Sequence, residues 1–383
     1  MNADQVNQSI DDSEIKLDDT STLNYSDVLK EINLLDADEV MKQIKDLKSE
    51  LKDQVTILGH HYQQDDIISF ADITGDSLIL SQEASKIKKP YTIFCGVHFM
   101  AETADLLSQG RTQRVILPDL SAGCSMADMA SAEDVEDAIA KINKINQKII
   151  PITYVNSSAA IKALVGRYDG YVCTSSNAEK IIKEAFRVAG NDSKIFFLPD
   201  QHLGRNTCYK MGIPLEEMYL YSPDLEVNEI EIKRSRIILW NGYCFVHQGF
   251  SVQQIEAIRK TSPETKVIVH PECPFDVVMN SDLVGSTAYI VKVISEAAEG
   301  SKFAVGTEIN LVNRLAQKFK GKKEIKSLSP YQCICSTMYR IKPKALLLAL
   351  ISIKNNNPIN VIRVEEKIRE DALKAINKML SIK

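Results

Sequence analysis

The sequence predicts an α/β protein in which parallel sheets lie between layers of helices. Two observations support this class. Short β-branched apolar runs alternate with stretches of helical periodicity from Met41 onward, and 44% of the 383 residues are hydrophobic, enough for a large core. At roughly 100 to 200 residues per domain, the length allows two or three domains. The body of the chain has no long linker, so we expect the domains to pack closely.

Nine apolar segments are predicted as strands, which is too many for one small doubly wound unit. They are residues 55–58, 91–95, 114–117, 149–155, 171–174, 195–198, 236–240, 266–269 and 303–305. Helices are predicted between them at residues 132–145, 177–189, 252–259 and 286–298. The longest apolar run, Ala345–Ile353, is nine residues long. Because a membrane span needs about 20 residues, this run predicts a core segment and no membrane anchor.

Charge is distributed unevenly along the chain. Residues 1–39 hold eleven Asp or Glu and two Lys, a net charge of −9, so the remaining 44 basic and 40 acidic residues give +4. A weakly positive body suits small anionic ligands but argues against a nucleic-acid partner. The acidic start resembles neither a secretory signal nor a transit peptide. We therefore expect residues 1–40 to form a partly disordered acidic tail on a cytoplasmic protein.

Chemically capable side chains cluster directly after the predicted strands. Because ligands bind at the carboxyl ends of parallel strands, several of these groups should face one central cavity. This arrangement suggests an enzyme built from repeated α/β layers. The clustered residues are His60, His61, Tyr62, Asp119, Cys124, Tyr154, Asn156, Asp200, His202, Cys244, His247, His270, Glu272 and Cys273.

The eight cysteines are interpreted as buried thiols or as metal ligands, since the cytoplasm keeps thiols reduced. Cys95 and Cys173 end apolar runs and are predicted to be packed thiols. The chain lacks paired CxxC motifs, and its one close pair is Cys333 with Cys335. Any metal ligands must therefore converge from distant positions. Cys124, Cys244 and Cys335 lie at element ends and are the candidates.

The chain also carries an ordered series of motifs that resembles the bacterial quinolinate synthase family. The motifs run from about Val55 to Lys342, roughly three quarters of the chain. They are ILGHHYQ, GDSLILSQ, FCGVHFMAETADLL, GCSMAD, YVNSSAAIKA, CTSSNA, FLPDQHLGRN, GYCFVHQGF, HPEC, GST, GTEINLVNRL and a final CxxM.

The resemblance implies three similar three-layer α/β/α domains around a pseudo-threefold axis, with a central active site. We expect the first domain at residues 41–125, joined by the C-terminal helices of residues 336–383. The second and third domains are expected at residues 126–240 and 241–335.

The resemblance further implies one 4Fe-4S cluster per chain, held by Cys124, Cys244 and Cys335. Cys335 is chosen over Cys333 because Met338 completes the CxxM motif. Three thiolates leave one iron with an open position, which suits Lewis-acid catalysis. The family is a transferase that condenses iminoaspartate with dihydroxyacetone phosphate. It releases phosphate and two waters and forms quinolinate for NAD biosynthesis.

The family motifs also imply roles for polar residues. Glu272 is the candidate general base, with a pKa that enclosure is expected to raise. His60, Tyr62 and Tyr154 are the other candidate catalytic residues, and His61 stands where the family has asparagine. The predicted substrate-binding residues are His60, Ser77, Tyr154, Asn156, Ser175, His270, Glu272, Ser286 and Thr287. Asp76, Glu102 and Glu308 recur in the motifs and are interpreted as structural. Ser286 by itself is also compatible with a simple helix N-cap.

Two other functions use the same cysteines. A hydro-lyase would use the cluster for simple dehydration, and an iron-sulfur carrier would need no polar groups around it. The ordered motifs favour synthesis, and the polar groups after the strands argue against a carrier. We expect L-aspartate oxidase to supply the iminoaspartate, with no nucleic-acid or membrane partner.

Overall fold

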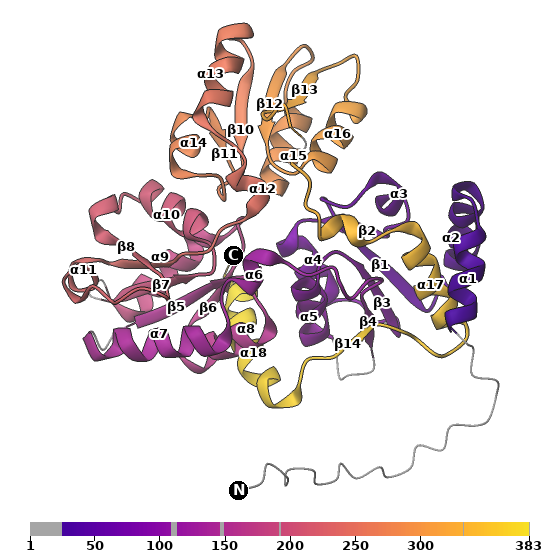
Figure 1. Ribbon diagram of the computed structural model, residues 1–383, viewed down its shortest axis with the longest axis horizontal. Helices are drawn as coiled ribbons and strands as arrows, with labels where there is room; N and C mark the ends of the chain where they lie inside the picture. Colours follow the sequence, from indigo (N-terminus) through magenta and orange to yellow (C-terminus); the bar gives the residue numbers. More distant parts are fainter. Residues whose placement is uncertain (1–24, 109–112, 146–148, 191–192, 332, 383) are drawn as a thin grey trace, which may run out of the picture.

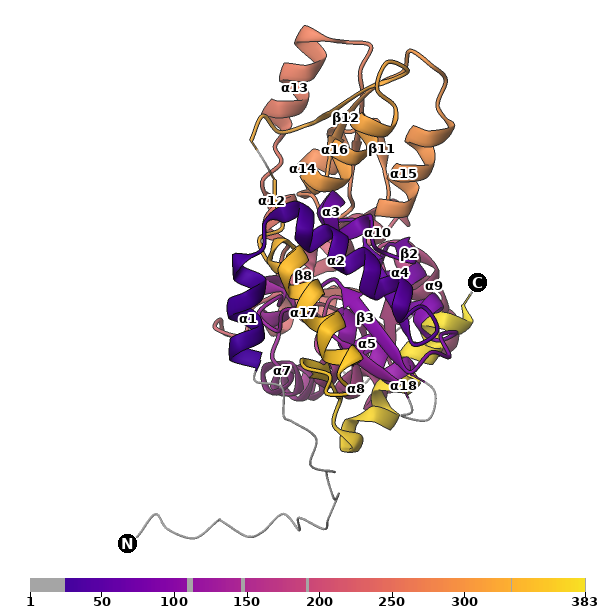
Figure 2. The same ribbon diagram turned by 90° about the vertical axis from the view of Figure 1, so that its right-hand side faces the viewer.

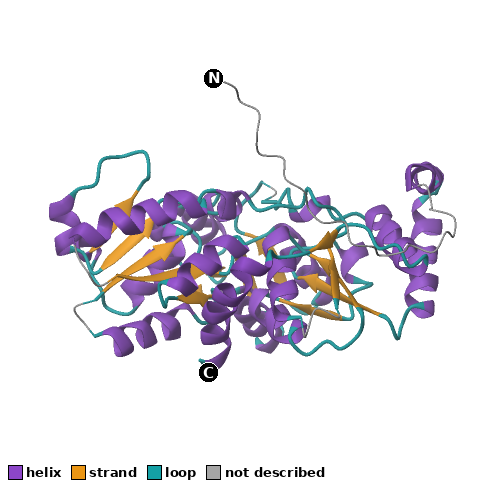
Figure 3. Cartoon of the chain, turned by 90° about the horizontal axis from the view of Figure 1, so that it is seen from below, coloured by secondary structure: helices purple, strands orange, loops and turns teal. Residues whose placement is uncertain are grey.

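The computed structural model describes residues 25–108, 113–145, 149–190, 193–331 and 333–382, and these residues form three sheets. Figure 1 shows the sheets arranged around a common centre, and Figure 3 shows helices on the outer sides of the strands. All three sheets are parallel except for one short antiparallel edge strand. The predicted α/β class with several helix-flanked parallel sheets is therefore confirmed.

The first sheet has the strand order β14-β4-β3-β1-β2. Its strands are β1 (Val55–His60), β2 (Ile73–Gly75), β3 (Tyr91–Cys95), β4 (Arg114–Ile116) and the antiparallel β14 (Val361–Ile362). The helices in this part of the fold are α1 (Tyr25–Leu34), α2 (Ala37–Glu50), α3 (Asp65–Ile68), α4 (Ser77–Ala84), α5 (His98–Leu107) and α17 (Pro343–Lys354).

The second sheet has the order β6-β5-β7-β9-β8. Its strands are β5 (Ile149–Tyr154), β6 (Tyr171–Cys173), β7 (Lys194–Leu198), β8 (Met218–Tyr221) and β9 (Ile237–Trp240). The helices in this part are α6 (Ser125–Asp128), α7 (Ala132–Ile145), α8 (Ala159–Arg167), α9 (Ala178–Ala189), α10 (Gln201–Lys210), α11 (Glu229–Arg234) and α18 (Glu366–Ser381), with the 3₁₀ turn η2 (Leu215–Glu217).

The third sheet has the order β11-β10-β12-β13. Its strands are β10 (Lys266–Val269), β11 (Leu283–Val284), β12 (Lys302–Gly306) and β13 (Glu324–Ser327). The helices are α12 (Phe245–Gln248), α13 (Val252–Thr261), α14 (Phe275–Asn280), α15 (Thr287–Glu296) and α16 (Ile309–Lys318), followed by the 3₁₀ turn η3 (Met338–Arg340).

The three sheets repeat one topology. In each, the first strand along the chain is flanked by the second and the third, and the third is followed by a later strand. All nine predicted strands are present, while β2, β8, β11, β13 and β14 were not predicted. Because parallel strands in such a repeat end on the same side, the loops after them meet at the centre of the molecule.

The C-terminal helices divide between two sheets. Helix α17 packs on α2, beside the first sheet, and contains the apolar run Ala345–Ile353, much of which is buried as predicted. Helix α18 packs instead on α8 and β6 of the second sheet. Figure 2 shows α17 beside α1 and α2. The expectation that residues 336–383 all join the first domain therefore does not hold for α18, and the other domain boundaries stay a prediction.

The expected acidic tail is shorter than residues 1–40. Residues from Tyr25 are helical, and Ile32 and Val40 are buried in the core because α1 and α2 each present an apolar face to it. Residues 1–24 lie outside the described part of the chain, so their predicted disorder stays a prediction. Within the described part, none of the helices combines the length and the apolar character needed to span a membrane.

Buried apolar residues join the first two sheets but not the third. One continuous cluster runs through the first and second sheets and includes side chains of α17 and α18. The third sheet has two smaller clusters of its own, one on each of its faces. Among the described residues the third sheet thus shares no buried apolar cluster with the other two, and its contacts with them include hydrogen bonds and the edge-to-face ring pair Tyr209–Phe275.

Candidate active site

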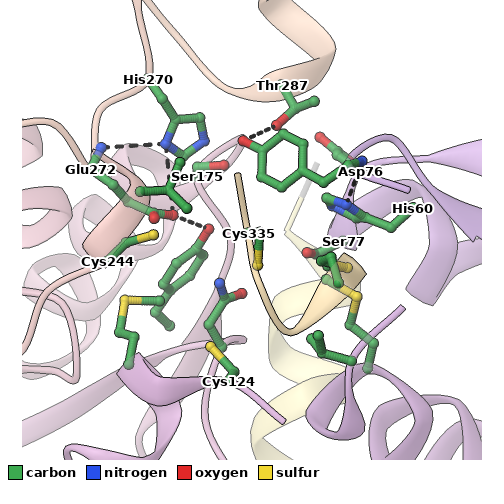
Figure 4. Close-up of a pocket in the computed structure, with 18 of the residues that line it drawn as sticks. His60, Asp76, Ser77, Cys124, Ser175, Cys244, His270, Glu272, Thr287 and Cys335 are labelled. Atoms are coloured by element: carbon green, nitrogen blue, oxygen red, sulfur yellow. Dashed lines mark hydrogen bonds and ion pairs between the residues drawn. The ribbon is translucent and has the colours of Figure 1, made fainter. Parts of the chain in front are cut away.

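An enclosed cavity lies where the carboxyl ends of the three sheets meet. Its open space is about 60 Å³, and every sheet contributes to its lining. Figure 4 shows the cysteines around its centre, with Glu272 and His270 on one side and His60 and Ser77 on the other. The predicted site residues that line it are His60, Tyr62, Ser77, Cys124, Tyr154, Asn156, Ser175, Cys244, His270, Glu272, Thr287 and Cys335.

Cys124, Cys244 and Cys335 reach this cavity from three different places in the fold. Cys124 is the N-cap residue of α6, Cys244 is the N-cap residue of α12, and Cys335 precedes the turn η3. Burial raises the pKa of each thiol, whereas backbone N–H groups of the helical turn that follows it lower that pKa. Each sulfur is thus paired with amides that would stabilise a thiolate when a metal replaces its proton.

The remaining cysteines named in the sequence analysis lie away from the cavity lining. Cys95, Cys173 and Cys273 are fully buried among apolar side chains, as expected for packed thiols. Cys333 is partly buried against the core of the third sheet. Of the close pair, Cys335 lines the cavity and Cys333 does not.

Glu272 lies at the centre of a buried hydrogen-bond network and is only 3% exposed. The Tyr154 hydroxyl donates to its Oε1 at 2.6 Å, and Nδ1 of His247 lies 2.9 Å from its Oε2. Nδ1 of His270 is 3.7 Å from Oε1, and the His270 ring stacks on that of His247 with centroids 4.5 Å apart.

This network overturns the expected pKa of Glu272. Burial by itself would raise the pKa, as the sequence analysis assumed. The neighbouring His270 and His247, together with hydrogen bonds from His247 and Tyr154, outweigh burial and hold the pKa below its usual range. Glu272 is therefore an ionised hydrogen-bond acceptor at neutral pH in this conformation.

His60 and His270 are neutral at pH 7, and Tyr62 and Tyr154 keep their protons. Burial is the main cause that lowers the pKa of His60 to about 3, with smaller contributions from His61, His270 and Arg314. Burial likewise lowers the pKa of His270 to about 3. Burial also raises the pKa of Tyr62 and Tyr154 well above its ordinary value. The site thus combines neutral imidazoles, hydroxyl donors and the carboxylates of Glu272 and Asp76.

Tyr62 connects the first sheet to the third. Its hydroxyl lies 2.7 Å from Oγ1 of Thr307 and accepts a hydrogen bond from Thr287 at 3.1 Å. Its backbone N–H donates to Nδ1 of His60 at 3.1 Å, which orients the imidazole. His61, in the place of the family asparagine, is outside the cavity lining, and its carbonyl accepts a hydrogen bond from Arg314 at 2.9 Å.

Helix starts from each sheet meet beside the cavity. Ser77 is the first residue of α4 and Thr287 the first residue of α15. Ser176 donates to Oδ2 of Asp76 at 2.8 Å, and its oxygen lies 2.9 Å from that of Ser286. Asp76 caps α4 and Ser286 caps α15, so each cap already satisfies one backbone N–H. The positive ends of the helix dipoles favour a phosphate or carboxylate on this side of the cavity.

Ser286 is the one predicted site residue that lies outside the cavity lining. Its oxygen accepts the backbone N–H of Tyr289 at 3.3 Å, which makes Ser286 the N-cap of α15. It lines a neighbouring, more open cavity of about 530 Å³ between the second and third sheets. In this conformation Ser286 therefore acts as the helix cap that its sequence context also allowed.

Sequence reasoning missed His247, Thr307 and Asn206 as parts of the site. His247 was noted only as a residue after a strand. It follows the N-cap Cys244 of α12 by three residues, and this spacing places the two side chains on the same face of the helix. Thr307 contacts both His247 and Tyr62.

Asn206 supports Glu272 from the second sheet. Its amide nitrogen donates to the carbonyls of Pro271 at 2.8 Å and Cys273 at 2.9 Å, on either side of Glu272. The Asn206 side chain is almost fully buried. These two bonds fix the backbone that carries Glu272, so Asn206 is a positioning residue for the carboxylate.

Comparison with known proteins relates the chain to one family. Residues 42–381 match the family model described as "Quinolinate synthetase A protein". A protein named "Quinolinate synthase" from Anoxybacillus flavithermus is 50% identical over 351 residues, which cover 91% of this chain and 94% of the relative. Proteins of the same name from Bacillus cereus and a Geobacillus species are each 48% identical. They cover 90% and 94% of this chain, and 94% and 100% of their own lengths.

Proposed function

The chain belongs to the quinolinate synthetase A family, and on that basis we propose that it makes quinolinate for NAD biosynthesis. The reaction is the condensation of iminoaspartate with dihydroxyacetone phosphate, with release of phosphate and two waters. The observation that carries this proposal is the enclosed cavity. Three cysteines from separate elements, the buried carboxylates of Glu272 and Asp76, and several neutral proton-transfer groups line it together.

The donor set fits a 4Fe-4S cluster. Cys124, Cys244 and Cys335 would hold it, because all three line the same cavity and each is followed by a helical turn whose N–H groups favour a thiolate. When bound, a cluster with three protein thiolates supplies a Lewis-acidic iron with an open coordination position. The sequence choice of Cys335 over Cys333 is supported by the cavity lining.

Anionic substrate groups would bind on the side formed by the helix starts. Ser77, Ser175 and Thr287 place hydroxyls there, and neutral His60 and His270 add imidazole hydrogen bonds. Oδ1 of Asn156 is buried in the cavity wall and has no hydrogen-bond partner in the described part of the chain. A buried acceptor of this kind is costly unless satisfied, so Asn156 suits a substrate hydroxyl or amine donor.

Proton transfer would use Glu272 and its neighbours. Condensation requires removal of protons from carbon or nitrogen and their return to departing hydroxyl groups. Glu272 is the acceptor, and the Tyr154 hydroxyl that donates to it is the nearest acid. Tyr62, held by Thr307 and Thr287, supplies a second hydroxyl beside His60. Because Glu272 is strongly acidic in the closed network, we infer that substrate must displace part of that network before it becomes an effective base.

The direct test is product formation in the absence of oxygen. The full chain is loaded with cluster and incubated with dihydroxyacetone phosphate, L-aspartate and L-aspartate oxidase, the enzyme that we propose supplies iminoaspartate in the cytoplasm. Quinolinate detected by mass spectrometry supports the proposal. Its absence from a sample that carries about four irons per chain contradicts it.

A matched pair of variants tests the ligand set. Cys335→Ala should lose the brown cluster absorbance and the product together, whereas Cys333→Ser should retain both. Loss of the cluster from Cys333→Ser with retention in Cys335→Ala would reverse the ligand assignment.

A further inference from the structure

Three donors of different chemistry come together on one wall of the cavity. The sulfur of Cys244, a ring nitrogen of His247 and a carboxylate oxygen of Glu272 all lie within 4.8 Å of one another. His247 and Glu272 are fully enclosed, and Cys244 is partly buried. Cys244 and His247 are three residues apart around α12, so one helical turn presents both to Glu272.

We propose that the cluster-free chain binds a single divalent transition-metal ion of the Zn²⁺ type through Cys244, His247 and Glu272. Thiolate, imidazole and carboxylate are the three ligand types that Zn²⁺ uses in proteins, and three protein ligands leave one position for water. The thiol of Cys244 gives up its proton to solvent on binding. One thiolate and one carboxylate then balance the ion's two positive charges, so a buried site carries no net charge.

The surrounding contacts orient two of the ligands for an ion. The Tyr154 hydroxyl donates to Oε1 of Glu272, which leaves Oε2 facing His247. Oγ1 of Thr307 lies 3.1 Å from Nε2 of His247 and can accept a hydrogen bond from this nitrogen. In the ion-free chain Nδ1 carries the ring hydrogen and donates to Oε2 of Glu272. On ion binding the ring takes its other tautomer, with the hydrogen on Nε2, and presents Nδ1 to the ion. Metal-bound histidines are commonly oriented by such a second hydrogen bond.

This site and the proposed cluster exclude each other. Cys244 belongs to both sets, whereas Cys124 and Cys335 lie outside the group of close donors. An ion bound first would hold Cys244 and delay loading of the cluster. This consequence alone rests on the proposed function, because the ion-binding site itself requires only the three side chains.

The test titrates Co²⁺ into the purified, cluster-free full chain and records its absorption spectrum. Tetrahedral Co²⁺ with a thiolate ligand gives visible d–d bands and a thiolate-to-metal charge-transfer band. We expect both, at one ion per chain, and displacement by Zn²⁺. Binding that lacks the charge-transfer band, or no binding at all, would overturn the proposal.

Two variants separate the ion site from the cluster site. His247→Gln should weaken Co²⁺ binding by about tenfold or more. Cys124→Ser should leave Co²⁺ binding intact, although it removes a proposed cluster ligand. Urea unfolding of each variant checks that it folds. If His247→Gln does not fold, Cys244→Ser replaces it as the test variant and should abolish the charge-transfer band. Equal Co²⁺ affinity in His247→Gln and the parent would show that the ion lies elsewhere.

The rate of cluster loading distinguishes the two proposals. Addition of one equivalent of Zn²⁺ before iron and sulfide should slow the rise of cluster absorbance in the parent chain and much less in His247→Gln. A chain that binds Co²⁺ as expected but never acquires a cluster would contradict the proposed function and leave the ion site standing.

Discussion

One buried apolar cluster spans the joint between the first and second sheets, whereas among the described residues no such cluster spans the joint to the third sheet, where buried polar side chains hydrogen-bond to one another. At the first joint, α5 of the first sheet packs on α8 and α18 of the second sheet, within one continuous cluster of buried apolar side chains. At the second, the contacts include hydrogen bonds such as Tyr154 to Glu272, Tyr62 to Thr307 and Asn206 to Pro271. Apolar burial stabilises the fold, while the polar joint gathers the groups that perform chemistry.

The largest effect is expected from the centre of the polar joint. Glu272→Gln removes the carboxylate that accepts from Tyr154 and His247, so turnover should fall by about 10²–10⁴-fold. Cluster absorbance should persist, since Glu272 is not one of the proposed cluster ligands. Initial rates of quinolinate formation measure the effect. Cys273→Ala, a neighbour in the apolar core, is the control and should retain turnover per folded molecule. Normal turnover in Glu272→Gln would remove Glu272 from its role.

The apolar joint should respond in the opposite manner. Ile376 on α18 is fully buried, so Ile376→Ala should lower the free energy of unfolding by about 2–5 kcal/mol through lost burial and a residual cavity. Ile376→Val is the matched control, with an expected loss of about 0.5–1.5 kcal/mol. Urea unfolding of the cluster-free chain measures both. A large fall in turnover per folded molecule, without loss of stability, would mean that the two joints are not distinct.

Acid should weaken the polar joint selectively. His60 and His270 have pKa values lowered from 6.5 to about 3, mainly by burial, so their neutral forms are favoured in the folded state. Unfolding lets them bind protons below pH 6.5. Their contribution is therefore full above pH 6.5 and is lost progressively as the pH falls towards 3. The free energy of unfolding of His60→Gln should fall less steeply than that of the parent over this interval. If the free energies of unfolding of His60→Gln and the parent fell in parallel with pH, His60 would not be a group whose pKa is lowered on folding.

The smallest effect is expected from the support behind Glu272. Asn206→Ala removes two hydrogen bonds to backbone carbonyls and should cost about 1–3 kcal/mol of stability. Displacement of Glu272 should also lower kcat by about tenfold with little change in KM. Asn310→Ala is the control, because Asn310 also crosses this joint, to the carbonyl of Tyr62, but lies away from the carbonyls that flank Glu272. Equal losses of kcat in both variants would contradict a specific positioning role.

The long strands were predictable because their sequences are continuous apolar runs. Val55 to Leu58 and Tyr91 to Cys95 are continuous apolar runs, and parallel strands buried on both faces favour such runs. The five missed strands are two to four residues long, and most include polar or exposed positions, as in Glu324–Ser327. They form by pairing with a neighbour that the local sequence does not specify.

The convergence of strand-end residues on one cavity was predictable, whereas the electrostatics of that cavity was not. Residues after strand ends were expected to converge because a repeated parallel topology brings those ends together, and all but Ser286 of the predicted site residues line the cavity. The pKa of Glu272 depends on His270, two residues away, and on His247 and Tyr154, which come from distant segments. No local pattern shows that His247 and Tyr154 contact the carboxylate, so burial alone suggested the wrong direction.

The placement of β14 and α18 has a consequence for biosynthesis. Strand β14 pairs with β4, and α18 covers α8 and β6, although both segments follow the third sheet along the chain. A ribosome therefore delivers this cover of the earlier sheets only after it has synthesised the third sheet. Until then, apolar surface on α8 remains exposed to chaperones and to other nascent chains. Such contacts between segments far apart in sequence favour slow maturation, with final closure of the first two sheets after translation.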